Sequence, residues 1–221
     1  MTTDFVSLDP QHRTALSIPA WAVGAWRREL LEWDDGEDRR TEVLWLQTPI
    51  LFADIRNPVD DSKMPEGFAG HLSVTGQTCR WNRPIDVKPK GGDGDIGVVS
   101  TRGTRMIELG VHRNYLEEWR RIDEGKTHFA ASRGSVQTGN DGVRWPSSGP
   151  LEIVVGMGPH LIHAWRSDKG VGVAYGRSAP DGLWSPERRA GNVERDPAPG
   201  PWTIWSATPD TQSAAQILAR F

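Results

Sequence analysis

The chain has 221 residues, with 26 basic and 29 acidic side chains that give a formal net charge of -3. This near balance, without a long run of one sign, excludes the electrostatic signature of proteins that bind a nucleic-acid duplex or an anionic membrane. No apolar run approaches the roughly 18 residues of a membrane-spanning helix, and the first residues do not resemble a signal peptide. We therefore expect a cytoplasmic protein with no nucleic-acid and no membrane partner, and the sequence makes no prediction of its oligomeric state.

Short strand-like segments, separated by Gly, Pro, Asn and Asp, follow one another along the chain. The segment Ala20–Trp33 is interrupted by Gly24, mixes apolar and charged residues, and ends at an Asp-Asp-Gly turn, so it favours a strand. Residues Thr41–Arg56 (TEVLWLQTPILFADIR) predict two strands joined by a Thr-Pro turn. Further strands then recur every 8–12 residues through both halves of the chain, which is the spacing of a meander.

This pattern predicts an all-β protein. About ten short strands fill the chain, and antiparallel sheets of that size usually close on themselves because closure removes exposed edges. We predict a single antiparallel β-barrel of about ten strands that forms one domain over residues 1–221, with a β-sandwich as the alternative. A barrel of this size leaves a lumen able to hold one small ligand. The segment TQSAAQILARF, after the start signal Pro209-Asp210, predicts a short C-terminal helix.

Charged residues lie inside the predicted strands. Period-two alternation places Phe52, Asp54 and Arg56 on one face of their strand, and this face is either solvent or a lumen that holds an ion pair. Glu108 lies between two apolar residues, so an inward-facing Glu108 would be a desolvated acid with a raised pKa, suited to general acid or base chemistry.

A second charged strand follows Glu108. The residues Tyr115, Glu117, Trp119 and Arg121 share one face of the segment YLEEWRR. Both faces of this segment carry an acid near a base, so salt bridges are one interpretation and ligand contact is the other.

The aromatic composition is unusual, with 11 tryptophans against 2 tyrosines and 5 phenylalanines. A buried indole N–H needs a hydrogen-bond partner, so several tryptophans are expected to be half exposed or to line a cavity. Trp45, Trp81 and Trp119 are the candidates for cavity walls. The alternative is that they fill the core and the ends of the barrel.

No cofactor or metal motif withstands inspection. The segment GVGVAYG has its third glycine misplaced for a dinucleotide fingerprint, and no helix-forming stretch follows it. His160 and His163 are three residues apart in a predicted strand, so they face opposite sides and cannot share one ion. We expect neither a cofactor nor a metal.

The order of several short segments between Phe52 and Arg121 carries a resemblance. The segments FADIR, FAGH, WNRPID, DIG, IELG and YLEEWRR resemble, in this order, a little-characterised family of lipocalin-like β-barrels that includes fungal casein-kinase-interacting proteins. The resemblance implies a lipocalin-like barrel. It implies no established enzymatic activity, because fold alone does not carry function.

The preferred hypothesis is that the lumen binds a small, largely apolar molecule. The side chains expected to contact it are Trp45, Asp54, Arg56, Trp81, Trp119 and Arg121. Asp54 with Arg56, and Glu108 with Arg121, are the expected orienting pairs.

Two alternatives belong to other functional classes. The first is a cofactor-free enzyme, for instance a cyclase, isomerase or dehydratase of a natural-product intermediate, with Glu108 or His71 as the catalytic acid or base. The second is a protein-interaction module whose barrel is filled with side chains. A cavity with a lone buried carboxylate favours the enzyme, paired charges favour binding, and a filled barrel favours the interaction module.

Overall fold

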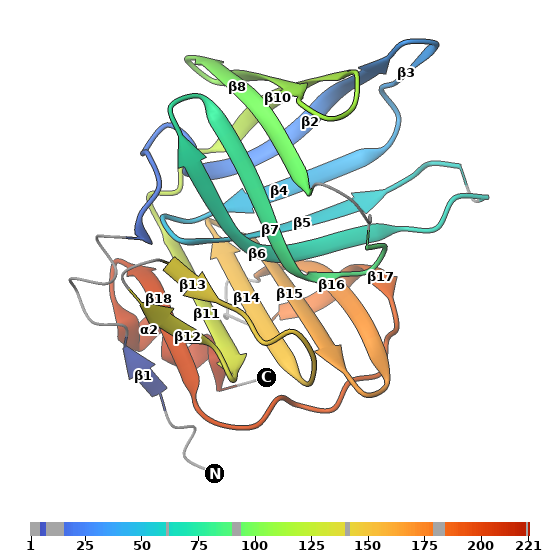
Figure 1. The fold of residues 1–221 in the computed structure, drawn as a ribbon. Helices are drawn as coiled ribbons and strands as arrows, with labels where there is room; N and C mark the ends of the chain where they lie inside the picture. Colours follow the sequence, from blue (N-terminus) through green and yellow to red (C-terminus); the bar gives the residue numbers. More distant parts are fainter. Residues whose placement is uncertain are drawn as a thin grey trace.

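The computed structural model describes residues 5–7, 16–60, 62–89, 94–139, 142–178, 184–219 and 221. Almost all of its regular structure is β-strand, arranged in two layers with one helix against the outer side of the second layer (Figure 1). The predicted all-β class and the short C-terminal helix are confirmed. No helix in the described part of the chain is long and apolar enough to cross a membrane.

The elements have the following bounds. They are β1 (Phe5–Ser7), β2 (Gly24–Trp33), β3 (Gly36–Asp38), β4 (Glu42–Gln47), β5 (Leu51–Asn57), β6 (Glu66–Thr75), β7 (Thr78–Asp86), β8 (Asp95–Arg102), β9 (Arg105–Gly110), β10 (Tyr115–Asp123), β11 (His128–Gly134), β12 (Gln137–Gly139), β13 (Gly142–Arg144), β14 (Leu151–Met157), β15 (His160–Ser167), β16 (Gly170–Ser178), β17 (Trp184–Gly191), β18 (Trp202–Thr208) and α2 (Thr211–Leu218).

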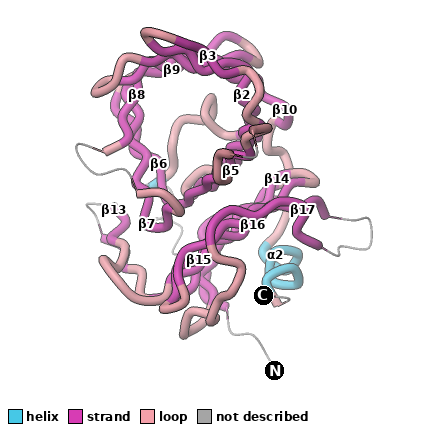
Figure 2. The backbone as a smooth tube through the Cα atoms, turned by 90° about the vertical axis from the view of Figure 1, so that its right-hand side faces the viewer, coloured by secondary structure: helices cyan, strands magenta, loops and turns pink. Residues whose placement is uncertain are grey.

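The first layer is the predicted antiparallel barrel. Strands β2 and β4 to β10 pair with their neighbours in turn, and β10 also pairs with β2, so eight strands form a closed ring (Figure 2). Strand β3 is an extra strand beside β2. A closed ring leaves no unpaired edge among its strands, which is the physical reason for the predicted closure.

The second layer is a separate sheet that the structure adds to the barrel. Its seven strands lie in the order β1-β18-β11-β14-β15-β16-β17, and the β1–β18 pair is parallel while the other pairs are antiparallel. Turn spacing is similar in both halves of the chain, and spacing alone does not specify which strands pair. The helix α2 begins after Asp210, whose side chain accepts a hydrogen bond from the Ser213 N–H as an N-cap.

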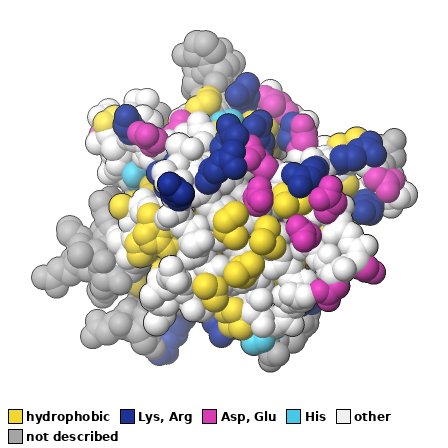
Figure 3. All heavy atoms as spheres, turned by 90° about the horizontal axis from the view of Figure 1, so that it is seen from above, with side chains coloured by type: hydrophobic (Ala, Val, Ile, Leu, Met, Phe, Trp, Pro, Cys, Tyr) yellow, Lys and Arg dark blue, Asp and Glu magenta, His cyan; other side chains and the backbone are white. Residues whose placement is uncertain are grey.

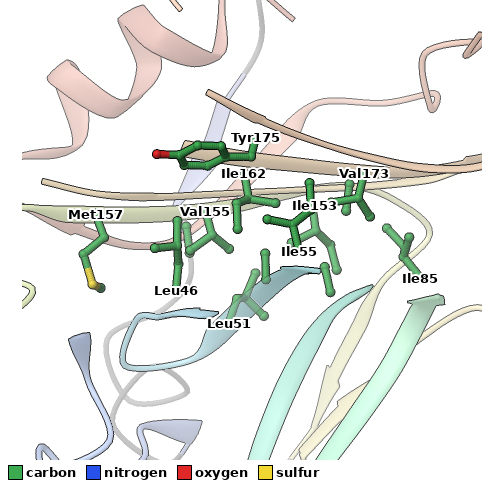
Figure 4. Close-up of a cluster of buried hydrophobic side chains, with 14 of the residues drawn as sticks. Leu46, Leu51, Ile55, Ile85, Ile153, Val155, Met157, Ile162, Val173 and Tyr175 are labelled. Atoms are coloured by element: carbon green, nitrogen blue, oxygen red, sulfur yellow. The ribbon is translucent and has the colours of Figure 1, made fainter. Parts of the chain in front are cut away.

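The two layers share one hydrophobic core between them (Figure 4). The barrel supplies Leu46, Leu51, Ile55 and Ile85, and the second sheet supplies Ile153, Val155, Ile162 and Val173. One wall of the barrel therefore packs against the second sheet with its outer face and points side chains into the barrel interior with its inner face. This double burial explains why the first five residues of β5 are all buried and why even its apolar positions do not alternate with exposed ones.

A second cluster fills one end of the barrel. It is built from inward-facing side chains that include Trp26, Phe52, Leu72, Cys79, Val99 and Met106. We call this the closed end of the barrel. The charged and polar inward-facing residues lie toward the other end, which we call the open end.

The outer face of the barrel carries a small apolar area. Val98 and Leu109 are cross-strand partners on β8 and β9, and both are exposed, as is Val111 just after β9. Seen from above, hydrophobic side chains gather near the middle of the molecule, with basic and acidic side chains beside one another nearby (Figure 3).

Candidate functional site

A cavity of about 590 Å³ occupies the open end of the barrel. Its lining includes Leu31, Trp33, Arg56, Trp81, Arg83, Asp95, Glu108, Tyr115 and Glu117 from the barrel, and Arg166 and Val171 from the second sheet. The Arg166 guanidinium donates hydrogen bonds to the carbonyl oxygens of Pro84, Pro146 and Gly149 at 2.8 to 2.9 Å. This side chain therefore ties the second sheet to the rim of the barrel, and both layers contribute to the cavity.

An ion pair lies at the floor of this cavity. Of the two interpretations of the charged face of β5, solvent or a lumen with an ion pair, the structure has the second. Arg56 Nε is 3.0 Å from Asp54 Oδ1, and the Asp54 side chain is buried. Arg83, on β7, stacks its guanidinium 3.5 Å from the centre of the Phe68 ring and forms an ion pair with Asp95. Burial, with Arg56 nearby, lowers the pKa of Arg83 to about 10, so its guanidinium stays charged at neutral pH.

Glu108 is a buried acid in the cavity wall, only 4% exposed. The Tyr115 hydroxyl donates a hydrogen bond of 2.7 Å to its Oε1, and among the described residues no basic group forms a salt bridge with it. Burial, and next the nearby Glu117, raise the pKa of Glu108 to about 8. At neutral pH this side chain is therefore largely a neutral carboxylic acid, able to donate a proton.

Two glycines make room for this pair of side chains. Gly97 on β8 and Gly110 on β9 are cross-strand partners. A Cβ atom at Gly97 would lie 2.8 Å from Glu108 Cγ, and one at Gly110 would lie 2.3 Å from the Tyr115 ring. Any other residue at these positions would displace Glu108 or Tyr115, so the local sequence is fitted to these side chains.

A second glutamate lies beside Glu108 on the inner face of the barrel wall. Glu117 on β10 is the cross-strand partner of Glu108 on β9, an arrangement that brings two side chains on one face close together. Unlike Glu108, Glu117 has a basic partner, because Arg28 Nη1 donates to its Oε1 at 2.9 Å. Arg28 is held in turn by Asp38 of the extra strand β3, at 3.0 Å. The site thus contains two adjacent carboxyl groups in different environments.

The three predicted wall tryptophans meet in one cluster. The ring centre of Trp45 lies 5.9 Å from that of Trp81 and 5.8 Å from that of Trp119. Trp81 lines both the main cavity and a void of about 10 Å³ at its base, whereas Trp45 and Trp119 line only the void, together with Asp54 and other residues. One tryptophan is therefore a wall and two form the floor.

His71 and Arg121 lie away from this cavity. His71 pairs with Leu51 in register, on the outward face of β6, and the Trp145 indole N–H donates to its Nδ1 at 2.7 Å. Burial lowers the pKa of His71 to about 4, which agrees with a neutral ring that accepts this bond. Arg121 lies 4.5 Å from the Trp26 ring at the closed end, so the expected Glu108–Arg121 pair does not form. The partner of Glu108 is Tyr115.

Three residues of the site, Arg83, Tyr115 and Arg28, were not predicted from the sequence as site residues. Arg83 shares the inward face of β7 with Trp81, and Tyr115 shares the inward face of β10 with Trp119, so the two-residue period contained a signal for both. Arg28 lies two residues after the inward-facing Trp26, so the same period placed it on the inward face as well. The register shift in the β10–β2 pairing comes only after Arg28 and changes the facing of the rest of β2.

The described residues contain no group of three or more His, Cys, Asp or Glu side chains placed to hold a metal ion. His160 contacts Tyr175, and His163 contacts Glu152, so the two histidines have separate partners. Of the cavity residues, the acids and the arginines can bind polar groups of a ligand, and Trp81 can pack on an apolar one.

Comparisons with known proteins place the fold and go no further. No protein-family model matches the chain, and no curated protein matches it. Among solved structures, it is similar to the crystal structure of the uncharacterized protein YLR301w from Saccharomyces cerevisiae, with a TM-score of 0.58 and 12% sequence identity. The match covers 76% of this chain and 86% of the yeast chain. At this identity the likeness concerns the fold alone.

Proposed function

We propose that this protein binds a small molecule in the cavity at the open end of the barrel. The observation that carries the proposal is the cavity itself, whose volume of about 590 Å³ lies within the range of roughly 300–1,000 Å³ that is common for ligand pockets. A barrel that served only as an interaction module would have no need of an open cavity lined by buried charges.

The lining favours a ligand with both an apolar and a polar part. Trp81 and Leu31 offer apolar surface, while Arg83, Glu108 and Glu117 offer hydrogen bonds. A wholly apolar ligand would cover these polar groups without replacing their hydrogen bonds to water, which costs affinity. We therefore narrow the expected ligand from largely apolar to one with a polar end that reaches the floor.

The second candidate function is acid-base catalysis in the same cavity, and the Glu108–Glu117 pair favours it. Glu108 has a raised pKa and a single hydroxyl partner, whereas Glu117 is paired with Arg28. Two neighbouring carboxyl groups with different environments can divide the roles of acid and base between them. Cyclases, isomerases and dehydratases need only such groups and a shaped cavity.

The family and location follow as proposals of the same kind. The similar fold of a yeast protein supports a relation to the lipocalin-like family that the segments between Phe52 and Arg121 resemble. The cytoplasmic location expected from the sequence stays a prediction.

Ligand-observed NMR with a fragment set tests the binding function. Leu31→Trp places a larger side chain in the cavity wall, and Glu32→Trp places the same side chain on the exposed neighbour as a matched control. Fragments that bind the wild type saturably should lose binding with Leu31→Trp and keep it with Glu32→Trp. If both variants bind alike, the fragments do not occupy this cavity, and the proposal fails.

Native mass spectrometry of the protein purified from its own source addresses the choice between binding and catalysis. A co-purifying molecule would name the ligand class. Conversion of that molecule by the wild type, lost in Glu108→Gln while binding remains, would favour the enzyme.

A further inference from the structure

Three buried hydrogen-bond donors at the floor of the cavity have no partner within the described residues. They are the indole Nε1 of Trp45, the indole Nε1 of Trp119 and the Nε of Arg83. An indole N–H and a guanidinium N–H can only donate, so each needs an acceptor. A buried donor without an acceptor destabilises the fold, and three such donors in one place are rare in native proteins.

The residues that carry these donors surround one small space. Trp45, Arg83 and Trp119 all line the void of about 10 Å³ beneath the main cavity. A space of this size accommodates one oxygen atom, the size of a single water molecule. The void and the main cavity share Arg83, Glu108 and other lining residues, so a group that enters from the open end can reach it.

The nearby acids do not accept from these three donors, and one oxygen of each is engaged elsewhere. Asp54 Oδ1 accepts from Arg56, and Glu108 Oε1 accepts from the Tyr115 hydroxyl. As a neutral acid, Glu108 would add a further donor to the floor. The three donors at the floor therefore lack an acceptor, which suits a group that only accepts.

The surrounding charges decide between a neutral and an anionic acceptor. Asp54, Asp95 and Glu117 lie around the floor with their arginine partners, so the acidic groups already use the positive charges. An added carboxylate would have to compete with them for the same guanidinium groups. A carbonyl oxygen only accepts and brings no charge, whereas a hydroxyl would also need an acceptor of its own.

We propose that the floor of the cavity holds the carbonyl oxygen of a neutral ligand, a ketone or an amide, with the indole N–H groups of Trp45 and Trp119 donating to it. This inference rests on the proposed binding function and names the chemical class of its ligand.

The test compares two probes of the same shape. 2-Acetylnaphthalene carries the carbonyl group, and 2-isopropenylnaphthalene replaces its oxygen with a methylene group. Binding of each is followed in the indole region of the ¹⁵N–¹H correlation spectrum, where Trp45→Phe and Trp119→Phe assign the two signals. Trp26→Phe is the matched control, because the Trp26 N–H is buried nearby but already donates to the Ala22 carbonyl at 2.9 Å.

The ketone should bind about tenfold more tightly than the alkene, the effect of roughly one or two net hydrogen bonds. It alone should move the indole N–H signals of Trp45 and Trp119 downfield and leave that of Trp26 in place. Trp119→Phe should reduce the preference for the ketone about threefold or more, and Trp26→Phe should leave it unchanged. If one Phe variant does not fold, the other still assigns its own signal, and the shift of that signal in the wild type decides the matter.

Other outcomes separate this inference from the proposed function. Equal affinity for both probes, with the Trp45 and Trp119 signals unmoved, would overturn the carbonyl site and leave binding in the cavity intact. Binding of other fragments while neither naphthalene probe binds would overturn it as well. If no fragment of any kind binds saturably, the proposed function itself fails.

Discussion

Glu108 in the barrel and Glu152 in the second sheet are both buried glutamates, yet they have opposite environments. Glu108 accepts one hydrogen bond, from the Tyr115 hydroxyl. Glu152 is fully buried on β14 and contacts Arg133, Arg195 and other donors at 2.6 to 3.1 Å. The comparison shows that partners rather than burial decide whether a buried acid is structural or chemically available.

The pKa values express this difference. Burial alone would raise the pKa of Glu152, but the hydrogen bond with His163 and the charges of Arg133 and Arg195 lower it to about 2. Burial raises the pKa of Glu108 to about 8, because no comparable set of donors opposes it. Glu152 also accepts the backbone N–H of Ala198, so it fastens the segment before β18 to the sheet.

The largest expected loss of stability is that of Glu152→Gln. The change leaves Arg133 and Arg195 without their carboxylate, and breaking a buried ion pair in this way costs about 3–5 kcal/mol of unfolding free energy. Urea unfolding at neutral pH measures the loss. Glu124→Gln, which breaks an exposed pair with Lys126, is the control and should cost less than about 1 kcal/mol. Equal losses in the two variants would mean that Glu152 is not a structural anchor.

The second prediction concerns the pH dependence that Glu108 causes. A carboxyl group with a raised pKa in the folded state stabilises the fold fully below its unfolded pKa of about 4.5, and this contribution disappears as the pH rises through about 8. Glu108→Gln should therefore remove a decline in the unfolding free energy between these pH values, on the order of 4–5 kcal/mol.

Glu152 should behave in the opposite direction. Its lowered pKa stabilises the fold above about 4.5, and this contribution disappears as the pH falls toward 2. Unfolding free energies of the wild type and Glu108→Gln, measured from pH 3 to pH 9, separate the two glutamates. Parallel curves above pH 5 would show that Glu108 is ionised in the folded protein.

The smallest expected effect is that of Tyr115→Phe. It removes the one hydrogen bond to Glu108 and should cost about 1 kcal/mol of stability. The pKa of Glu108 should rise further, because this hydrogen bond favours the ionised carboxylate. Carboxyl ¹³C NMR measures the titration. Tyr175→Phe, which removes a hydroxyl that contacts His160 in the second sheet, should leave Glu108 unchanged. A lowered Glu108 pKa in Tyr115→Phe would contradict the assigned role of the hydroxyl.

Part of the site could be predicted from single strands. Alternation along β5 placed Asp54 beside Arg56, and the structure contains that ion pair in the lumen. Alternation along β10 likewise grouped Tyr115 with Glu117 and Trp119 on one face, and all three point inward. Alternation could not show whether Glu108 and Arg121 form a pair. The two residues belong to different strands, and their relative positions along the barrel axis depend on the strand register.

The sequence by itself determined the all-β class, the terminal helix and the facing of residues within a strand. These properties are local, because side chains alternate along any extended chain and turns depend on a few neighbouring residues. Only the tertiary structure decided which strands form the second sheet, which end of the barrel is filled and which acid has a basic partner. Those outcomes depend on contacts between residues far apart in the chain, such as Arg28 with Glu117, 89 positions away, and His71 with Trp145, 74 positions away.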